Sequence, residues 1–507
     1  MKKEIIFNES IRLRDSLLLL IVIVMLSSTA TDAQTIQSSH YRIPNHNCND
    51  VIIRESSKGT PVISYHSHSS PYGARFMYGD LNSGTVKEFI IYDTNTAANN
   101  TISYAVNDMR VVGDMCYFCG IRVYTHGEPD PETGGVLKDS VGILGRFPLN
   151  PSGFGGSVKF DLKHFHETKC LSRMATYVYG TDTLLAIIGI VNQPTSQSCL
   201  TVARVNGLNS WQYNVLYPNV SATMDVFTDI AIDAQMTTIA SYQKANGGRD
   251  HFCLRSSRNF MLDFDTYTDL DNLYKYSVSP LTTNDTCVRL VRPEYADVRL
   301  SAVPWEKKVY AAFMTSEDSC PTSPYRTAMC EIQTSDMLIN NAQVVQRLYR
   351  DSHSLVDMKY LYRTFGTEVG ASVALLHLAD DNYNTIVEYP NALVSSYSGV
   401  VPKVLVQMHG KNRMSSVSAY GGNVRFGGVW EVSAPVLTCL QEDLPSVYSN
   451  SQCMVNCDAD IMTVGGPQGP QTLYSQLQRL YFDMSDLEWD TKTSSTTTVT
   501  VTNVCSY

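Results

Sequence analysis

Apolar and polar residues alternate along short stretches of this chain, and one arrangement of them recurs. An acidic residue precedes an alternating apolar run, a polar break follows, and a second apolar run rich in small residues comes next. The four clearest copies begin at Asp108, Asp229, Asp297 and Asp357. Alternation with a period of two is typical of β-strands, so each copy predicts a hairpin.

Three weaker copies extend the repeat and begin at Asp50, Ala175 and Ser416. The starting points are roughly sixty residues apart, and a third apolar segment follows most hairpins, so each unit can hold three or four strands. We therefore predict an all-β fold, a β-propeller with seven blades, with six blades as the fallback. An array of two-sheet sandwiches is the alternative, but its units would be about one hundred residues long.

The repeated acid has two interpretations. An aspartate before a strand commonly accepts hydrogen bonds within a turn, and we expect this structural role for Asp50, Asp108, Asp229, Asp297 and Asp357. The alternative is a ring of carboxylates at the mouth of a central channel, where it would bind a cation. Small residues in each second strand would let neighbouring blades pack closely near the axis.

The two ends of the chain differ from the repeat. Residues 1–33 combine a basic leader, an apolar run and a small-residue stretch before Gln34, the pattern of a secretory signal peptide. The apolar run is about ten residues long and a membrane span needs about twenty, so an uncleaved anchor is the lesser alternative. We assign 34–438 to the propeller and 439–507 to a C-terminal extension. Apolar residues at helical spacing within 473–484 predict a short helix. The Thr/Val-rich stretch 494–504 predicts a strand or a stalk, and as a strand it could pair with an N-terminal segment to close the ring.

Composition narrows the class of partner. The 507 residues carry a net charge of −10, which argues against nucleic acid as a partner because nucleic-acid binding needs a basic face. Beyond the signal no stretch is apolar for long enough to cross a membrane. The 13 cysteines of an exported chain could form disulfides, and Cys320 with Cys330, which flank a turn, is the most natural local pair. Cys116 and Cys119 lie at an odd offset in one strand, so they should not bond to each other.

No motif of a known catalytic or cofactor site is present, and we expect no cofactor. Two His-x-His pairs, His66/His68 and His164/His166, could each place two rings on one face of a strand, and the second pair lies near Asp161 and Glu167. A metal needs three or four converging ligands, so we expect no metal site, with His164 and His166 as the only candidates. The segment 64–78 is the densest aromatic and polar stretch and is a candidate ligand-binding loop. Its candidate contact residues are Tyr65, His66, His68, Tyr72 and Tyr78.

One stretch carries a resemblance to a known class of protein. The unit 107–120, with Asp108, Met109, Val111, Phe118 and Gly120, resembles a blade hairpin of secreted β-propeller proteins of Bacteroidetes type. The resemblance extends over roughly 40–435 and implies the propeller fold. No functional residue carries over with it. The Trp-Asp dipeptide that marks one well-defined propeller family occurs once, at 489–490, and does not recur with the repeat, and the units show no recurring double-glycine pattern of another such family.

Two functions follow as hypotheses. The first is an exported propeller, periplasmic, surface-bound or extracellular, that binds a glycan or a protein without catalysis. The second is a polysaccharide-acting hydrolase or lyase with acids at the channel mouth. With 49 acidic residues, a catalytic pair cannot be chosen from the sequence, because the criterion is separation in space.

Overall fold

The computed structural model describes most of the strands and a smaller part of the connections. Of this part of the chain, every regular element is a β-strand except the 3-10 helix η1 (Leu81–Ser83). The predicted all-β class is confirmed. The described residues are 38–42, 48–56, 58–67, 73–92, 101–131, 134–150, 152–179, 182–191, 198–206, 210–218, 226–234, 238–246, 249–257, 274–277, 289–290, 298–302, 308–316, 325–335, 338–348, 354–365, 368–379, 383–390, 403–409, 413–420, 423–430, 434–440, 477–480 and 489–506.

Antiparallel strands pair in sequence order to form seven blades, each with its first strand innermost. Blade 1 contains β2 (Cys48–Glu55), β3 (Pro61–Ser67), β4 (Gly73–Tyr78) and β5 (Thr85–Ile91). Blade 2 contains β6 (Thr101–Val112), β7 (Met115–Pro129), β8 (Val136–Pro148) and β9 (Ser157–Phe165). Blade 3 contains β10 (Thr168–Tyr179), β11 (Asp182–Val191), β12 (Ser198–Asn206) and β13 (Ser210–Pro218).

The remaining four blades follow the same order. Blade 4 contains β14 (Val226–Ile232), β15 (Thr238–Asn246), β16 (Arg249–Ser257) and β17 (Tyr274–Ser277). Blade 5 contains β19 (Val298–Ala302), β20 (Lys308–Ser316), β21 (Tyr325–Ser335) and β22 (Leu338–Leu348), with the short β18 (Arg289–Leu290) also on β20. Blade 6 contains β23 (Ser354–Phe365), β24 (Glu368–Ala379), β25 (Tyr383–Pro390) and β26 (Lys403–His409). Blade 7 contains β27 (Arg413–Tyr420), β28 (Asn423–Trp430), β29 (Ala434–Leu440) and, from the other end of the chain, β1 (Ser38–Arg42).

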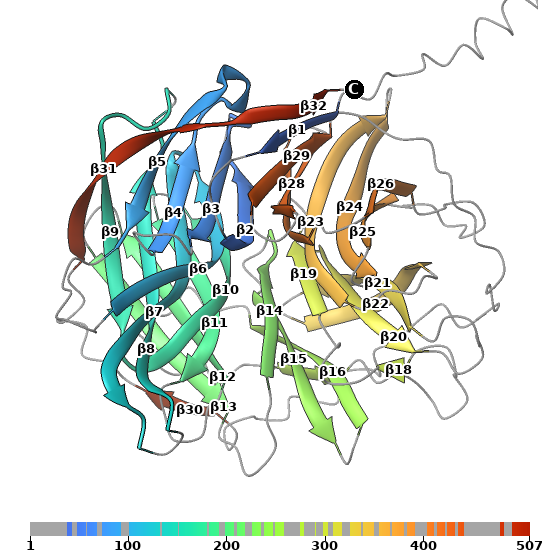
Figure 1. Cartoon of the computed structure of the whole chain (residues 1–507). Helices are drawn as coiled ribbons and strands as arrows, with labels where there is room; N and C mark the ends of the chain where they lie inside the picture. The colour runs from blue at the N-terminus through green and yellow to red at the C-terminus, as the bar shows by residue number, and fades with distance from the viewer. Residues whose placement is uncertain are drawn as a thin grey trace, which may run out of the picture.

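The first strands of the blades form a closed ring. Each of β2, β6, β10, β14, β19, β23 and β27 contacts the next, and β27 contacts β2. Figure 1 shows the sheets arranged radially around this ring. The seven-bladed propeller predicted from the repeat is confirmed.

Apolar side chains fill the space between neighbouring blades. Between blades 1 and 2 a cluster of phenylalanine rings packs at centroid distances of 4.8 to 5.1 Å, with Phe76 contacting Phe89, Phe118 and Phe147. Gly145 lies under the Phe118 ring, and a Cβ there would come within 2.0 Å of it. Small residues in the second and third strands therefore allow this aromatic packing, because a larger side chain would occupy the same space.

The C-terminal segment runs around the outside of the ring. β30 (Leu477–Leu480) pairs with β13, the outer strand of blade 3. β31 (Asp490–Thr500) pairs first with β9 of blade 2 and then with β5 of blade 1, so the two blades form one nine-stranded sheet. β32 (Thr502–Ser506) pairs with β1 of blade 7. Figure 1 shows this red segment crossing the outer edges of the blue and cyan blades.

Two expectations for the extension have different outcomes. The helix predicted within 473–484 is wrong where the structure describes it, because Leu477–Leu480 is a strand on the edge of blade 3. The strand predicted over 494–504 is present as parts of β31 and β32, and β32 pairs with the N-terminal β1 as expected. The signal segment 1–33 lies outside the described residues. Within them, no helix has the length and apolar character that crossing a membrane would require.

Candidate functional site

Buried aspartates on the inner strands link neighbouring blades. Asp108 lies within β6, next to a shift in the pairing register with β7, and is fully buried. Its Oδ1 accepts a hydrogen bond from the backbone N–H of Met109 at 2.8 Å. Its Oδ2 accepts one from the backbone N–H of Met174 in blade 3 at 3.0 Å. One carboxylate thus satisfies donors on two blades.

The same geometry recurs in blade 4. Asp229 accepts a hydrogen bond from the N–H of Ile230 at 2.9 Å and another from the N–H of Leu300 in blade 5 at 2.7 Å. In blade 6, Asp357 accepts from the N–H of the next residue at 3.0 Å. The turn role predicted for these three acids is therefore wrong, because each lies inside a strand and not before it. Asp297 lies outside the described residues, and the side chain of Asp50 is not described.

Arginines pair with these carboxylates across the centre of the ring. Arg54 of blade 1 lies 2.7 Å from Asp108 and 3.4 Å from Asp357, and its Nε donates to the carbonyl of Met109. Arg110 lies 2.7 Å from Asp108, and Arg173 of blade 3 lies 3.7 Å from Asp357.

The ion pairs between these arginines and aspartates keep both Asp108 and Arg54 charged. Burial alone would raise the pKa of Asp108, but Arg110, Arg54 and Arg173 lower it to about 2. Burial opposes the charge on Arg54, and its carboxylate partners outweigh that effect and hold its pKa above the ordinary value. Asp229 differs, because burial raises its pKa and the nearby arginines offset this only in part. Asp108 and Asp357 are ion-paired with arginines, which favours a structural role over cation binding or acid catalysis.

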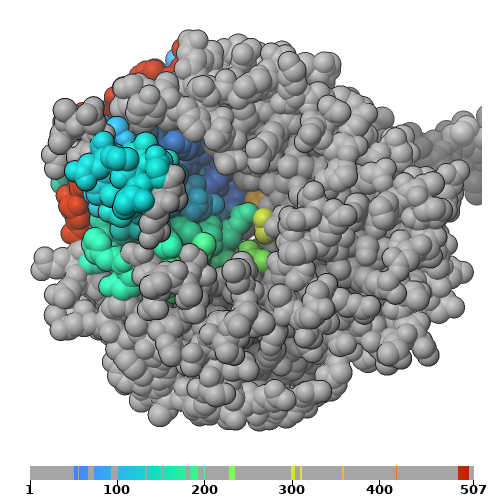
Figure 2. Space-filling model, turned by 60° about the horizontal axis from the view of Figure 1, so that its bottom comes forward, coloured from blue at the N-terminus to red at the C-terminus, as the bar shows by residue number. Residues whose placement is uncertain are grey.

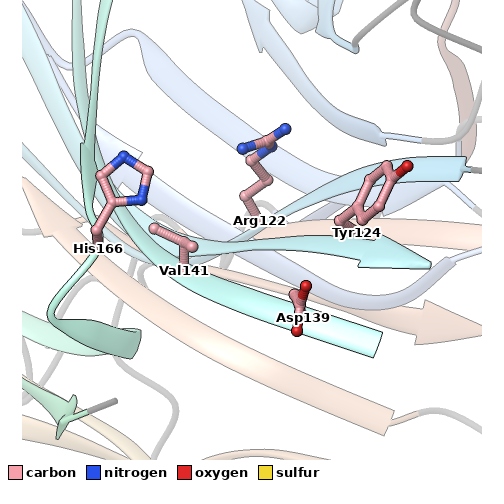
Figure 3. A pocket seen from close by; sticks show the side chains of 5 residues that line it. All are labelled: Arg122, Tyr124, Asp139, Val141 and His166. Atoms are coloured by element: carbon pink, nitrogen blue, oxygen red, sulfur yellow. The ribbon is translucent and has the colours of Figure 1, made fainter. Parts of the chain in front are cut away.

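A pocket lies at one end of blade 2. β7 and β9 both run antiparallel to β8, so the β7–β8 hairpin and the turn from β9 to β10 lie at the same end of the blade. The pocket there has a volume of about 260 Å³ and is lined by Arg122, Tyr124, Asp139, Val141 and His166. Figure 3 shows these side chains on one side of the two neighbouring strands and the turn. Figure 2, seen from this end, shows the cyan residues of blade 2 beside the hollow at the centre of the ring.

The strand pairing explains why the side chains converge. Arg122 is paired with Val141, and Tyr124 with Asp139, in the ladder between β7 and β8. Side chains two apart on a strand share a face, so Arg122, Tyr124 and His126 project to the same side. The ring of His126 lies edge-on to Tyr124 at 4.3 Å and its Nε2 is 2.7 Å from Asp139.

The pocket holds a cation, Arg122, that has no carboxylate partner among the described residues. The Nε of Arg122 is shielded from solvent and has no hydrogen-bond partner among the described residues. The nearby His164 is also partly buried, and its Nε2 has no partner among them. Burial, with a smaller contribution from the charge of Arg122, lowers the pKa of His164 to about 4. His164 is therefore neutral at neutral pH, and Arg122 supplies a fixed positive charge.

The candidate loop 64–78 is only partly described. Tyr65 is buried, and its hydroxyl donates to Glu88, which also pairs with Arg75. Tyr78 is buried against the ring of Phe154 at 5.7 Å. Neither tyrosine side chain is exposed to solvent in this structure, so neither is accessible to a ligand. His66 is half-buried and hydrogen-bonded to Ser103 of blade 2 at 3.0 Å, while His68 and Tyr72 lie outside the described residues.

The histidines predicted as candidate metal ligands lie near each other, and only one of the two cysteines of the predicted disulfide is described. His164 and His166 have ring centroids 6.3 Å apart, and Asp161 is paired with Arg146 at 2.8 Å. The described residues contain no group of three His, Cys, Asp or Glu side chains that could hold a metal. Cys330 lies in β21, but Cys320 lies outside the described residues, so their predicted bond stays untested. The thiols of Cys116, Cys119 and Cys170 are free.

Sequence reasoning missed the pocket as a unit. It named His166 but not Arg122, Tyr124 or Asp139. The signal was present as Arg-x-Tyr-x-His at 122–126, a polar face on a strand whose other part is apolar. The pairing register of β7 and β8, which places Asp139 beside Tyr124, cannot be read from the sequence.

Comparisons with known proteins do not assign the chain to a family. No protein-family model and no curated protein matches it. Among solved structures, it is similar to extracellular domains 1–2 of Drosophila semaphorin 1a, with 10% identity, a TM-score of 0.43, and coverage of 82% of this chain and 90% of that one. It is also similar to the polysaccharide lyase Uly1, with 8% identity, a TM-score of 0.42, and coverage of 79% and 91%.

A third similar structure is the β-propeller domain of Myceliophteria thermophila Cps50 (Swd1), with 9% identity, a TM-score of 0.34, and coverage of 78% and 98%. Proteins at this distance differ too much for a ligand or an activity to be transferred. The propeller assignment rests on the strand pairing and on the closed ring of inner strands.

Proposed function

We propose that this protein is an exported, non-catalytic propeller that binds a glycan at the end of blade 2 that carries the pocket. The observation that supports this is the convergence of an arginine, a tyrosine and a carboxylate around a space of about 260 Å³. Polar groups placed sparsely around an aromatic ring are typical of sites that orient a small polar ligand. Tyrosine adds apolar contact area for a sugar ring and a hydroxyl for its polar edge.

The polysaccharide-acting hydrolase or lyase is the competing function. Its acids were expected at the channel mouth. Asp108, Asp229 and Asp357 on the inner strands are instead buried and hydrogen-bonded to backbone N–H groups, which leaves them poorly suited to protonate a ligand. Binding without turnover is therefore the function that the described residues support best.

Binding to an immobilised glycan panel tests the proposal. We expect wild-type protein to bind a subset of the glycans and Tyr124→Ala to weaken that binding by about tenfold, which corresponds to about 1.4 kcal/mol. Tyr92→Ala is the matched control, since Tyr92 is an exposed tyrosine at the end of β5 and does not line the pocket. Equal binding by wild type and Tyr124→Ala would contradict this site. Release of shortened product from any glycan would favour the enzyme instead.

Export is tested separately. We propose cleavage before Gln34, on the signal pattern in 1–33 alone. Expression of the full chain in a secreting host should yield a mature N-terminus at Gln34 by mass spectrometry. Retention of residues 1–33 in the membrane fraction would contradict the proposal.

A further inference from the structure

We infer that the pocket at the end of blade 2 recognises the anionic group, carboxylate or sulfate, of an acidic sugar, with Arg122 as its counter-ion. This inference rests on the proposed function and gives the chemical class of its ligand. It is carried by the contrast between Arg122 and the other described arginines of blades 1 and 2, and by the polar groups that face it.

Arginines elsewhere in these blades have carboxylate partners. Arg54 and Arg110 pair with Asp108, Arg75 pairs with Glu88, and Arg146 pairs with Asp161. Arg122 has no such partner among the described residues, although its Nε is removed from solvent. Burying a guanidinium donor without an acceptor is costly, so the site gains free energy when an anion supplies one.

The neighbours of Arg122 do not supply that anion. Asp139, across the pocket, is paired with His126 at 2.7 Å. His164 is neutral at neutral pH and has a shielded Nε2 without a partner among the described residues. A planar carboxylate or a sulfate can accept two parallel hydrogen bonds from one guanidinium, which a neutral hydroxyl cannot do.

The remaining groups favour a sugar over a free inorganic anion. Asp139 has a second carboxylate oxygen beyond the one nearest to His126, and it can accept a hydrogen bond from a hydroxyl group. Tyr124 supplies a ring that can cover an apolar sugar face. The volume of about 260 Å³ lies just below the range of sites for drug-sized molecules, so a single ring fits better than a long segment of chain.

Calorimetry with four small probes tests the inference on the full-length protein. The probes are glucuronate, glucose 6-sulfate, neutral glucose and inorganic sulfate. We expect glucuronate or glucose 6-sulfate to bind at least tenfold more tightly than glucose and than inorganic sulfate. The comparison of the first two distinguishes a carboxylate from a sulfate as the natural group.

Three variants identify the counter-ion. Arg122→Met should reduce the affinity for the preferred acidic sugar at least tenfold and leave that for glucose unchanged, whereas Arg122→Lys should give an intermediate loss. Lys159→Gln is the control for a general loss of positive charge, because Lys159 is exposed on β9 and does not line the pocket. In the absence of ligand, Arg122→Met should melt at or above the wild-type temperature, since it removes a guanidinium whose shielded Nε has no acceptor among the described residues.

The outcomes separate this inference from the proposed function. If sugars bind in a Tyr124-dependent way with no preference for the acidic probes, the inference is overturned and glycan binding stands. If inorganic sulfate binds through Arg122 and no sugar does, the glycan function is overturned and the anion site stands. Equal losses for acidic and neutral sugars in Arg122→Met would also contradict the role of Arg122 as counter-ion.

Discussion

The carboxylate of Asp108 and the backbone N–H of Met174 form a 3.0 Å hydrogen bond that joins blade 2 to blade 3. Asp229 forms the equivalent bond to Leu300 between blades 4 and 5. Propeller blades otherwise contact each other mainly through apolar faces, which are not directional. These acids therefore fix the register of one inner strand against the next, in addition to stabilising the contact.

Replacing Asp108 should strongly destabilise the fold. Asp108→Asn removes the charge that pairs with Arg54 and Arg110, and the side-chain amide cannot serve every donor that the carboxylate serves. Loss of one partner from a buried ion pair costs about 3–5 kcal/mol. Urea unfolding followed by fluorescence should show this decrease. Asp490→Asn is the control, because that acid is exposed and its one ion pair among the described residues is with Lys492 at 3.2 Å, so a change within about 0.5 kcal/mol is expected.

A double-mutant cycle should show that Arg54 and Asp108 act together. Arg54→Leu alone leaves the carboxylates of Asp108 and Asp357 without their shared arginine partner. Combining it with Asp108→Asn removes one of the two carboxylate charges that lost this partner. The double variant should therefore be more stable than the sum of the single effects predicts, with a coupling of about 1–3 kcal/mol. Strictly additive losses would show that the two side chains act independently.

His164 should make the protein less stable in mild acid. Its pKa is lowered in the folded state to about 4, from an ordinary value of 6.5, so between these values the unfolded chain binds more protons. Stability from this group is complete above pH 6.5 and is lost as the pH falls towards 4. Because the ring is only partly buried, the loss should be on the order of 1–2 kcal/mol.

The matched measurement compares two histidines. Unfolding of wild type and His164→Gln at a series of pH values between 7 and 4 should give a smaller pH dependence for the variant. His166→Gln should retain most of the wild-type dependence, since His166 is exposed in the same turn and its charge is only a minor cause of the lowered pKa of His164. Identical slopes for wild type and His164→Gln would rule out this contribution.

The C-terminal strand β31 should hold blades 1 and 2 together. Val499 is buried with Val501 in the apolar cluster of blade 1, whereas Thr498 is exposed. Val499→Asp places a charge in that cluster and should lower the free energy of unfolding by more than about 2 kcal/mol. Thr498→Asp is the control and should change it by less than about 0.5 kcal/mol.

Loss of β31 also exposes the outer edges of β5 and β9, and unpaired strand edges promote association between molecules. Size-exclusion chromatography of Val499→Asp should therefore show oligomers that Thr498→Asp does not form. A monomeric Val499→Asp with wild-type stability would contradict this role of β31.

The repeat predicted the blades well because it reflects a local property of each unit. All seven predicted starting points fall in or directly before the first strand of a blade, and Ala175 lies within β10 two residues beyond a register shift at Arg173. The residue at the register shift differs between blades, for example Asp108 in blade 2 and Arg173 in blade 3. The sequence pattern therefore locates the first strand of a blade better than it locates the residue at the shift.

Other features depend on contacts between distant residues. The second hydrogen bond of Asp108 goes to a backbone group 66 residues away, and no local pattern indicates it. The leucines around 477 have helical spacing, but the free edge of β13 provides backbone partners that favour a strand. The pocket arises in the same way from the register of β7 and β8.

The pairing of β1 with both β29 and β32 has a consequence for biosynthesis. Residues 38–42 leave the ribosome before every other described strand, yet their partners on one side end at residue 440 and on the other lie at 502–506. Synthesis proceeds from the N-terminus at about 5–20 residues per second, so the ring stays open until nearly the whole chain has been made. During that interval the N-terminal strand is an unpaired edge, and a chaperone that binds extended segments would have its target there.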